Sequence, residues 1–360
     1  MQRALQLARL GAGAVSPNPM VGCVVVHGGK IIGEGWHRKY GEAHAEVNAV
    51  NAVFDKSLLS ESDIYVTLEP CSHFGKTPPC ADLLIRHQVR KVTVCNYDPN
   101  PLVAGQGIEK LRQAGIEVEV GLLAEEGREL NKRFFTSIEK KRPYIILKWA
   151  ESADGFIAKK NYEAVQISNL LSRRFVHKMR SEEDAIMIGT NTARYDNPTL
   201  NTRFWTGKNA VRVLIDKDLS LSHVVVSVFT DNNATVISED TDNNVLETLP
   251  IFNNSQLTIC YNTLENNILS DNIFVKISTN SSIEQFILQD LYQRKVQSII
   301  IEGGAILLQS FIDLGLWDEA SILKSKLILE DGIKAPAIGG IEISKENLGD
   351  NLLTKWKPSL

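Results

Sequence analysis

Four residues in the first quarter of the chain have types and spacing suited to metal-assisted hydrolysis: His44, Glu46, Cys71 and Cys80. One imidazole and two thiolates can hold zinc and leave a fourth position free for water. Because a carboxylate two residues beyond the imidazole can carry protons to and from that water, the set predicts a zinc hydrolase acting on a C–NH2 group. The pattern has the H-x-E … P-C form of nucleobase deaminases, but residues 72–79 form a longer gap than in P-C-x-x-C.

A closed zinc site is the alternative interpretation of this cluster. His73 would then be the fourth ligand, and Glu46 would be an ordinary surface residue of an amphipathic helix. In a closed site the carboxylate of the H-x-E arrangement would have no catalytic role, so the open site is favoured. His37 also stands near the motif, and the sequence leaves open whether it reaches a substrate or is a packed histidine.

A second chemical feature lies near the end of the chain. The apolar run 299–301 leads through Glu302 into Gly303 and Gly304, and a helical pattern starts at Ala305. Glycines at such a turn let backbone N–H groups approach a phosphate at the helix N-terminus, although a plain strand–helix turn would read the same way. The pair Gly11 and Gly13 is too short a match to a dinucleotide fingerprint and follows no strand.

Composition narrows the class of protein. The chain has 360 residues, 43% of them hydrophobic, a net charge of -4 and five cysteines. This length accommodates two domains, and an odd cysteine count without a regular framework fits a reducing compartment. The charge balance does not indicate a nucleic-acid binder, and no apolar run approaches the roughly 20 residues of a membrane helix. We therefore expect a cytoplasmic protein without a cleaved leader, a nucleic-acid partner or a membrane partner.

The elements that must position these residues follow an alternating pattern in the first part of the chain. Apolar runs and turn signals predict strands at 21–27, 30–35, 64–68, 91–95 and 116–120, and helices at 44–54, 80–87, 107–114 and 125–138. Such a rhythm implies a three-layer α/β domain with a mostly parallel or mixed sheet. His44 and Cys80 would each stand at the start of a helix. The positive end of the helix dipole lowers the pKa of a thiol there, which favours the Cys80 thiolate as a zinc ligand.

A charged segment that ends in proline, 139–143, predicts a linker, and the α/β pattern then starts again. We expect strands at 144–150, 185–188, 211–215 and 298–301, helices at 172–180 and 305–314, and a strand-rich segment at 320–329. Residues 231–280 contain eleven Asn, with strand-like pieces at 234–237 and 256–260, and are expected to form a loose edge of the second domain. The predicted domains are 1–142 and 143–360.

Four motifs in the first domain resemble those of the bifunctional riboflavin-biosynthesis deaminase–reductase family: PNPMVG at 17–22, GEAHAE at 41–46, EPCSHFGKTPPC at 69–80 and DPNP at 98–101. The long cysteine spacing is typical of that family. The resemblance implies a cytidine-deaminase-like fold, one Zn²⁺ held by His44, Cys71 and Cys80, and Glu46 as the proton shuttle. It also places Asn18 in the base pocket and makes Lys76 the candidate for the ribose-phosphate end.

The resemblance continues through LK at 147–148, SADG at 152–155, RS at 180–181, GTNT at 189–192, DNPTLNTR at 196–203 and EGG at 302–304. These motifs resemble the reductase half of the family, whose fold is similar to dihydrofolate reductase. The implied NADPH contacts are Thr192, Asp196, Gly304, Ala305, Ile306, Leu307, Leu308, Gln309 and Ser310. The implied substrate contacts are Arg180, Leu200, Arg203 and Glu302, with the two arginines able to clamp a sugar phosphate.

Four positions depart from the family pattern: Glu151, Ala153, Ala164 and Gln166 stand where Ala, Leu, Ser and Trp are common. The family Trp packs near the cofactor, so Gln166 leaves reductase activity open. The expected substrate is 2,5-diamino-6-(5-phosphoribosylamino)pyrimidin-4-one, deaminated first and then reduced with NADPH, and the family implies a homo-oligomer. The alternatives are an inactive reductase half, a nucleobase or tRNA deaminase with an unrelated C-terminal domain, and a zinc-stabilised binding module without turnover.

Overall fold

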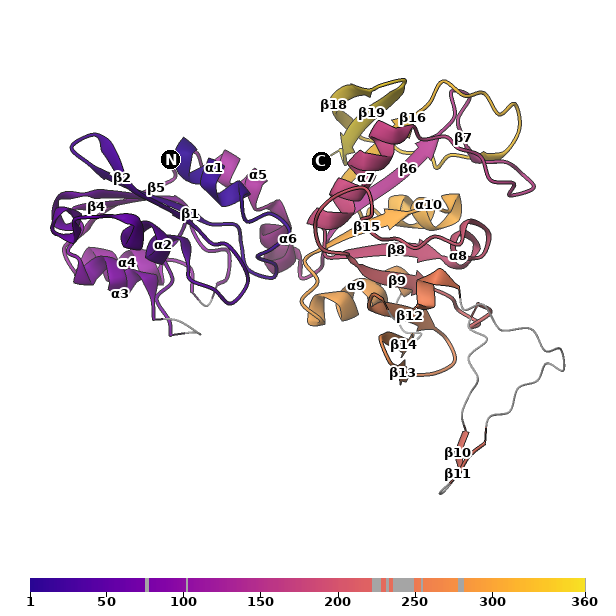
Figure 1. The fold of residues 1–360 in the computed structure, drawn as a ribbon, viewed down its shortest axis with the longest axis horizontal. Helices are drawn as coiled ribbons and strands as arrows, with labels where there is room; N and C mark the ends of the chain where they lie inside the picture. The colour runs from indigo at the N-terminus through magenta and orange to yellow at the C-terminus, as the bar shows by residue number, and fades with distance from the viewer. Residues whose placement is uncertain are drawn as a thin grey trace. The chain divides into compact units, whose positions relative to one another are not determined.

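The computed structural model describes residues 1–74, 78–101, 103–221, 228–230, 233–235, 249–253, 255–277 and 282–359. These residues form two compact units (Figure 1). One comprises Met1–Tyr144 with Gln289–Ser298, and the other comprises Ile145–Leu288 with Ile299–Leu360. In the described parts of the chain, no helix combines the length and the apolar character that a membrane crossing requires.

The first unit is built on a five-stranded mixed sheet with the order β2-β1-β3-β4-β5. Its strands are β1 (Gly22–His27), β2 (Lys30–Trp36), β3 (Asp63–Leu68), β4 (Lys91–Asn96) and β5 (Glu117–Val120). β1 runs antiparallel to both β2 and β3, whereas β3, β4 and β5 are parallel. The strands expected from the sequence are all present, and their parallel part explains why the connections carry helices.

Helices cover both faces of this sheet (Figure 1). One face carries α2 (Ala45–Ala52), α3 (Cys80–Arg86) and α4 (Gln106–Gln113), and the other carries α1 (Gln2–Arg9) and α5 (Ala124–Leu130). Side chains alternate along β1, so Cys23 and Val25 pack in the core on one face while Val24 packs against α1 on the other. The expected three-layer α/β arrangement is confirmed.

The single helix expected at 125–138 is wrong, because the chain forms α5 and then α6 (Lys132–Lys140), with Asn131 between them. The backbone N–H of Met20 donates to Oδ1 of Asn131 at 2.9 Å, and Nδ2 of Asn131 donates to the Met20 carbonyl at 2.9 Å. These two bonds fasten the loop before β1 to the junction of α5 and α6. Asn131 is therefore buried and committed to a distant loop, which helical periodicity does not reveal.

The second unit contains a ten-stranded sheet with the order β13-β14-β12-β9-β8-β15-β6-β16-β19-β18. The strands are β6 (Tyr144–Glu151), β8 (Ala185–Gly189), β9 (Val211–Ile215), β12 (Thr258–Asn262), β13 (Asn267–Leu269), β14 (Asn272–Lys276), β15 (Ser298–Glu302), β16 (Glu319–Lys324), β18 (Ile341–Leu348) and β19 (Asn351–Lys357). The central strands β8, β9 and β15 are parallel and buried along almost their whole length. Continuous apolar runs suit such strands because both faces of the sheet are covered.

The helices of this unit are α7 (Leu170–Glu182), α8 (Thr190–Asp196), α9 (Ile283–Gln293) and α10 (Ala305–Asp313). Two short strands, β7 (Phe156–Ala158) and β17 (Ile333–Lys334), form a separate pair, and β10 (Val228–Thr230) pairs with β11 (Asn233–Thr235). The strand-rich expectation for 320–329 holds only up to Lys324, and much of 231–280 lies outside the described residues.

Candidate metal centre and cofactor cavity

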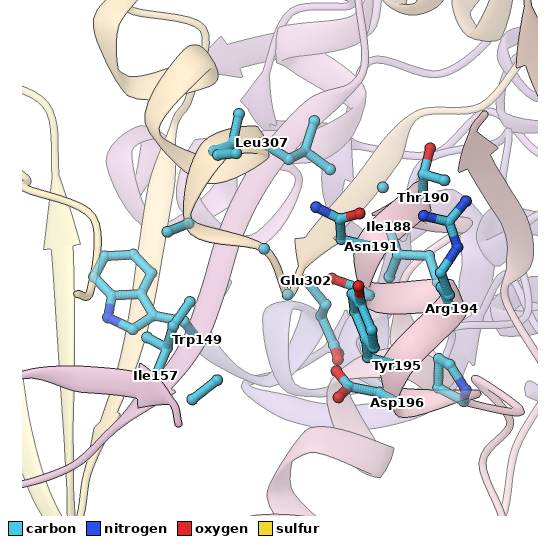
Figure 2. Close-up of a pocket in the computed structure, with 18 of the residues that line it drawn as sticks. Trp149, Ile157, Ile188, Thr190, Asn191, Arg194, Tyr195, Asp196, Glu302 and Leu307 are labelled. Carbon is cyan, nitrogen blue, oxygen red and sulfur yellow. The ribbon is translucent and has the colours of Figure 1, made fainter. Parts of the chain in front are cut away.

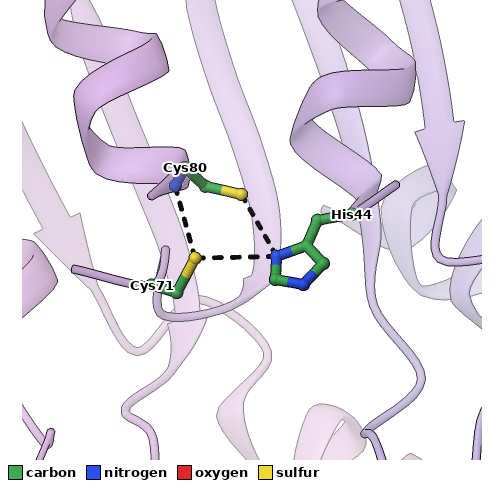
Figure 3. A group of neighbouring side chains, drawn as sticks. All are labelled: His44, Cys71 and Cys80. Atoms are coloured by element: carbon green, nitrogen blue, oxygen red, sulfur yellow. Dashed lines mark hydrogen bonds between the residues drawn. The ribbon is translucent and has the colours of Figure 1, made fainter. Parts of the chain in front are cut away.

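The three predicted zinc ligands come together in the first unit (Figure 3). His44 is the N-cap of α2, Cys80 is the first residue of α3, and Cys71 follows β3. The parallel strands end on one side of the sheet, so the helix starts and the strand exit meet there. The ligand atoms of the three residues all lie within 4.8 Å of one another.

The geometry of these donors fits a tetrahedral zinc ion. Nδ1 of His44 lies 3.3 Å from Sγ of Cys80 and 3.6 Å from Sγ of Cys71. Ordinary Zn–N and Zn–S bond lengths at a tetrahedral angle place a nitrogen and a sulfur about 3.5 Å apart. His73 is exposed and is not part of the cluster found among the described residues, so three ligands leave room for a water.

The electrostatics of the cluster favour a metal-binding thiolate. The hydrogen bond from Cys80 lowers the pKa of the Cys71 thiol well below its usual range, and His44 adds to this effect. The backbone N–H of Cys80 also donates to Sγ of Cys71 at 3.3 Å, as expected for an acceptor at a helix start. The same pairing and burial raise the pKa of Cys80, so one negative charge is shared between the two sulfurs before a metal is bound.

Glu46 lies in the first turn of α2, and its side chain is buried. Burial, with a smaller contribution from the neighbouring Cys71 thiolate, raises the pKa of Glu46 to about 7. The closed-site alternative required a surface glutamate, so the observed burial argues against it.

His37 and Asn18 lie beside the cluster. The rings of His37 and His44 meet edge to face with centroids 5.6 Å apart. Nε2 of His37 lies 3.2 Å from Nδ2 of Asn18, and Nδ1 lies 3.2 Å from the Ala43 carbonyl. The structure thus packs His37 with both nitrogens engaged and places Asn18 at the edge of the site. Lys76, the predicted contact for the ribose phosphate, lies outside the described residues.

Glu69, which sequence reasoning left without a role, fixes the loop beneath the cluster. Its buried carboxylate accepts from the backbone N–H groups of Asp98 (3.2 Å), Gly105 (2.9 Å), Gly107 (2.9 Å) and Ile108 (3.4 Å). A Cβ at Gly107 would lie 1.9 Å from the Pro70 carbonyl oxygen, so the start of α4 is pressed against the segment that carries Cys71.

The second unit contains a cavity of ≈ 1140 Å³ (Figure 2). The predicted residues that line it are Thr192, Asp196, Gly304, Ala305, Ile306, Leu307, Ser310, Arg180, Leu200, Arg203 and Glu302. Leu308 is fully buried in the core, and Gln309 bonds to Asp313 and Ala337, so neither lines the cavity. Only one face of helix α10 is turned toward the cavity, whereas the prediction took every residue from Gly304 to Ser310.

The Gly303–Gly304 turn has the backbone that the sequence suggested. Both glycines have positive φ, 68° and 63°. A Cβ at Gly303 would lie 2.6 Å from Cγ2 of Thr192, so this position requires glycine for space as well as for conformation. The turn places the N-terminus of α10 on the cavity, where the helix dipole and free N–H groups favour a phosphate.

Glu302 and Arg180, both predicted to contact substrate, line the cavity and contact each other. Nε and Nη2 of Arg180 donate to the Glu302 carboxylate at 3.1 and 2.7 Å, and Nζ of Lys148 lies 3.7 Å away. Burial alone would raise the pKa of Glu302, but Arg180 and Lys148 hold it at about 2. Of the two arginines predicted to clamp a sugar phosphate, Arg180 has a carboxylate partner, whereas Arg203 bonds to the neutral side chains of Thr199 and Asn201.

Several cavity residues were missed by sequence reasoning. Lys148 belongs to a quoted motif but had no role. His177 lies on α7, and burial lowers its pKa, with the charges of Arg180 and Arg203 adding to the shift. Tyr162 and Tyr195 stack with ring centroids 3.9 Å apart, joining the segment after β7 to α8. No local motif marks such residues, since they become neighbours only when distant elements pack.

Some of the residues that depart from the family pattern line the cavity, and others do not. Ala164 and Gln166 line the cavity, so the replacement of the common Trp changes its wall. Glu151 does not line it: its carboxylate accepts from Nε1 of Trp149 at 2.9 Å and pairs with Lys324.

Comparison with protein families gives two matches. The model of the cytidine and deoxycytidylate deaminase zinc-binding region matches residues 1–96. The model of the RibD C-terminal domain matches residues 143–348, which excludes an unrelated C-terminal domain. The predicted fold class, deaminase-like followed by a dihydrofolate-reductase-like reductase domain, is confirmed.

Relatives match over nearly the whole chain. The riboflavin biosynthesis protein RibD of Aquifex aeolicus is 37% identical, covering 99% of this chain and 97% of the relative. The RibD protein of Actinobacillus pleuropneumoniae is 40% identical over 94% of this chain and 86% of its own. A solved diaminohydroxyphosphoribosylaminopyrimidine deaminase/5-amino-6-(5-phosphoribosylamino)uracil reductase from Thermotoga maritima is 33% identical, covers 100% of this chain and 97% of its own, and has a TM-score of 0.85. With both halves matched in one continuous alignment, the chain belongs to the RibD family of riboflavin biosynthesis proteins.

Proposed function

We propose that this protein carries out two consecutive steps of riboflavin biosynthesis, deamination by residues 1–142 and NADPH-dependent reduction by residues 143–360. The substrate is 2,5-diamino-6-(5-phosphoribosylamino)pyrimidin-4-one, a small phosphoribosyl pyrimidine. The observation that carries the proposal is the cluster of His44, Cys71 and Cys80 with the buried carboxyl group of Glu46 beside it. Three N/S donors with a proton carrier are what hydrolysis of a C–NH2 bond needs.

In the first step, His44, Cys71 and Cys80 hold zinc, which when bound lowers the pKa of a water at the open position. Glu46 takes a proton from that water and delivers it to the departing amine, so that C2–NH2 and water become a C2 carbonyl and ammonia. Its raised pKa suits both halves of this transfer near neutral pH. Asn18 faces the pyrimidine, where a side-chain amide can pair with the ring edge.

In the second step, the Gly303–Gly304 turn and Thr192 hold the cofactor at the N-terminus of α10. Bound NADPH supplies the hydride that reduces C1′ of the ribosyl group to a ribityl chain. Arg203, which bonds only to neutral partners in the described chain, is the cation that we assign to the substrate phosphate. The Arg180–Glu302 pair gives the cavity a fixed polar wall on which ribose hydroxyls can be oriented.

Replacement of Glu46 tests the deaminase assignment. Glu46→Ala should keep zinc bound, because the three ligands are untouched, while deamination falls by about 10²- to 10⁴-fold. Zinc content by atomic spectroscopy and ammonia release measure the two properties. Deamination at the wild-type rate in the zinc-loaded variant would exclude this mechanism, and a wild-type protein without turnover would support the binding-module alternative.

The reductase assignment needs a separate assay because Gln166 changes the cavity wall. The purified protein should oxidise NADPH when given the deaminated intermediate, with a ribityl product. A wild-type protein that releases ammonia but leaves saturating NADPH unchanged would instead be a deaminase with an inactive reductase half. Gln166→Trp is the matched variant, since it restores the residue common in the family.

A homo-oligomeric state and a cytoplasmic location, without nucleic-acid or membrane partners, are further parts of this proposal. They rest on the family expectation and on the charge balance of the sequence. Size-exclusion chromatography with light scattering measures the oligomeric state, and a monomeric mass would contradict that part.

A further inference from the structure

Two cationic side chains line the cavity where strand β9 ends. Arg194 comes from α8, and Lys217 comes from the turn that follows β9. Nη2 of Arg194 donates to Oγ of Ser220 at 2.7 Å, a neutral partner. Within the described residues neither cation forms an ion pair, so both charges are available to a ligand.

The acid at the end of the same strand is unavailable to a ligand. Asp216 is 1% exposed. Its Oδ2 accepts from the backbone N–H of Leu221 at 2.9 Å, and its Oδ1 accepts from Oγ of Ser220 at 3.1 Å. In dinucleotide-binding folds, an acid near such a strand end binds the ribose 2′-hydroxyl of NAD, whereas an arginine accommodates the 2′-phosphate of NADP. Here the acid borders the cavity but is committed to the hydrogen bonds of its own turn, whereas the two cations lining the cavity beside it have no ion-pair partner in the described chain.

Helix α8 connects this end of the cavity to the glycine turn. Thr192 lies beside Gly303, and Arg194 of the same helix reaches Ser220. In the view of Figure 2, Arg194 and Thr190 stand on one side of the cavity and Trp149 and Ile157 on the other, with Glu302 between them. A dinucleotide whose pyrophosphate sits at the turn and whose nicotinamide points toward Glu302 therefore directs its adenosine toward α8 and the end of β9.

We propose that Arg194 and Lys217 form the subsite for the 2′-phosphate of the cofactor and so determine the preference for NADPH over NADH. This inference rests on the reductase function proposed above. A dianionic phosphate gains charge-assisted hydrogen bonds from both cations, whereas the ribose hydroxyl of NADH gains neither charge. Asp218 also lines this end, and its carboxylate opposes the phosphate.

The test uses the full chain and two probes that differ by one phosphate: adenosine 2′,5′-bisphosphate and ADP. Calorimetric titration should show that the wild type prefers the bisphosphate and that added salt reduces this preference. Arg194→Gln and Lys217→Gln should each weaken bisphosphate binding about tenfold and leave ADP binding unchanged. Asp218→Asn should strengthen bisphosphate binding only. Lys276→Gln, the same change at an exposed lysine outside the cavity, should change neither.

Equal binding of the two probes by the wild type would overturn the subsite. Equal losses for both probes, or no loss in either glutamine variant, would do the same. The outcome does not depend on turnover: a protein that prefers the bisphosphate but does not oxidise NADPH would keep the subsite and lose the proposed reductase function.

Discussion

At the scale of single residues, the two sites use burial in opposite ways. Glu46 is buried beside thiols, and burial moves its pKa to about 7, so that it can both accept and release a proton. Glu302 is equally buried, but Arg180 and Lys148 keep it ionised with a pKa of about 2. The first carboxyl group is suited to proton transfer, whereas the second is suited to holding a fixed charge in the cavity wall.

His177 gives a prediction for acid stability. Burial, together with the charges of Arg180 and Arg203, lowers its pKa from 6.5 to about 4. Between these two values the unfolded chain binds more protons than the folded chain, so the free energy of unfolding should fall as the pH falls from 6.5 to 4. His177→Gln should remove this part of the decline.

Urea unfolding followed by tryptophan fluorescence, at about pH 7 and about pH 5, measures the effect on the unfolding free energy. The signal reports mainly on the second unit, because Trp36 alone of the five tryptophans lies in the first. His87→Gln, at a partly exposed histidine of the first unit, is the control and should leave the decline in this signal unchanged, because the first unit contributes little to the fluorescence. A wild type and a His177→Gln variant with the same pH dependence would contradict the prediction.

The residues that a local motif contains could be predicted from the sequence. His44, Glu46, Cys71 and Cys80 meet because each stands at a helix start or strand exit, and those positions follow from periodicity. The Arg180–Glu302 pair could not be predicted, because it joins α7 to β15 across more than a hundred residues of sequence. Glu69 and Arg194 were missed for the same reason, because their partners come from other elements, and Lys217 was missed because the cavity that it lines is built by distant segments.

At the scale of elements, regular strands and helices were predictable, and their ends and interruptions were not. Apolar periodicity gave all five strands of the first sheet. It did not give the break at Asn131, which depends on the Met20 loop, or the hairpin of β18 and β19. β18 is exposed along most of its length, so it lacks the apolar pattern by which strands are recognised.

Glu69, which anchors the start of α4, gives a prediction for the stability of the first unit. Glu69→Gln keeps the size of the side chain but replaces one acceptor oxygen with a donor that faces backbone N–H groups. The free energy of unfolding of the first unit should fall by about 2–3 kcal/mol. Zinc affinity should fall with it, because the displaced loop adjoins Pro70 and Cys71.

Glu61→Gln is the matched control, since Glu61 is exposed at the end of the short 3-10 helix Lys56–Glu61. Chemical denaturation and competition with a zinc chelator measure stability and affinity. Unchanged values for both in Glu69→Gln would show that the four hydrogen bonds do not hold the ligand loop.

At the scale of the whole molecule, the chain combines two cores with two separate chemistries. The ligand cluster lies entirely in Met1–Tyr144, and every residue that lines the cavity belongs to the second unit. No residue is shared between the two sites in the described chain. The family match over both halves explains why one polypeptide carries a hydrolytic step and a reductive step.

Removal of the metal should separate the two activities. Dialysis against a strong chelator should reduce deamination by about a hundredfold or more, since the water is no longer activated. Reduction of the deaminated intermediate should continue, because no zinc ligand lies in the second unit. Zinc added back should restore deamination, and a parallel loss of both activities would indicate that zinc stabilises the whole chain.

The contact between Gly303 and Thr192 has a consequence for sequence divergence and for directed evolution. A methyl group at 303 would overlap the threonine side chain at 2.6 Å, and the positive φ adds strain. Thr192 can shrink without moving the turn, but Gly303 cannot grow while Thr192 remains. Libraries that aim to change cofactor use are therefore better built on Thr192 and its helix, with the two glycines held constant.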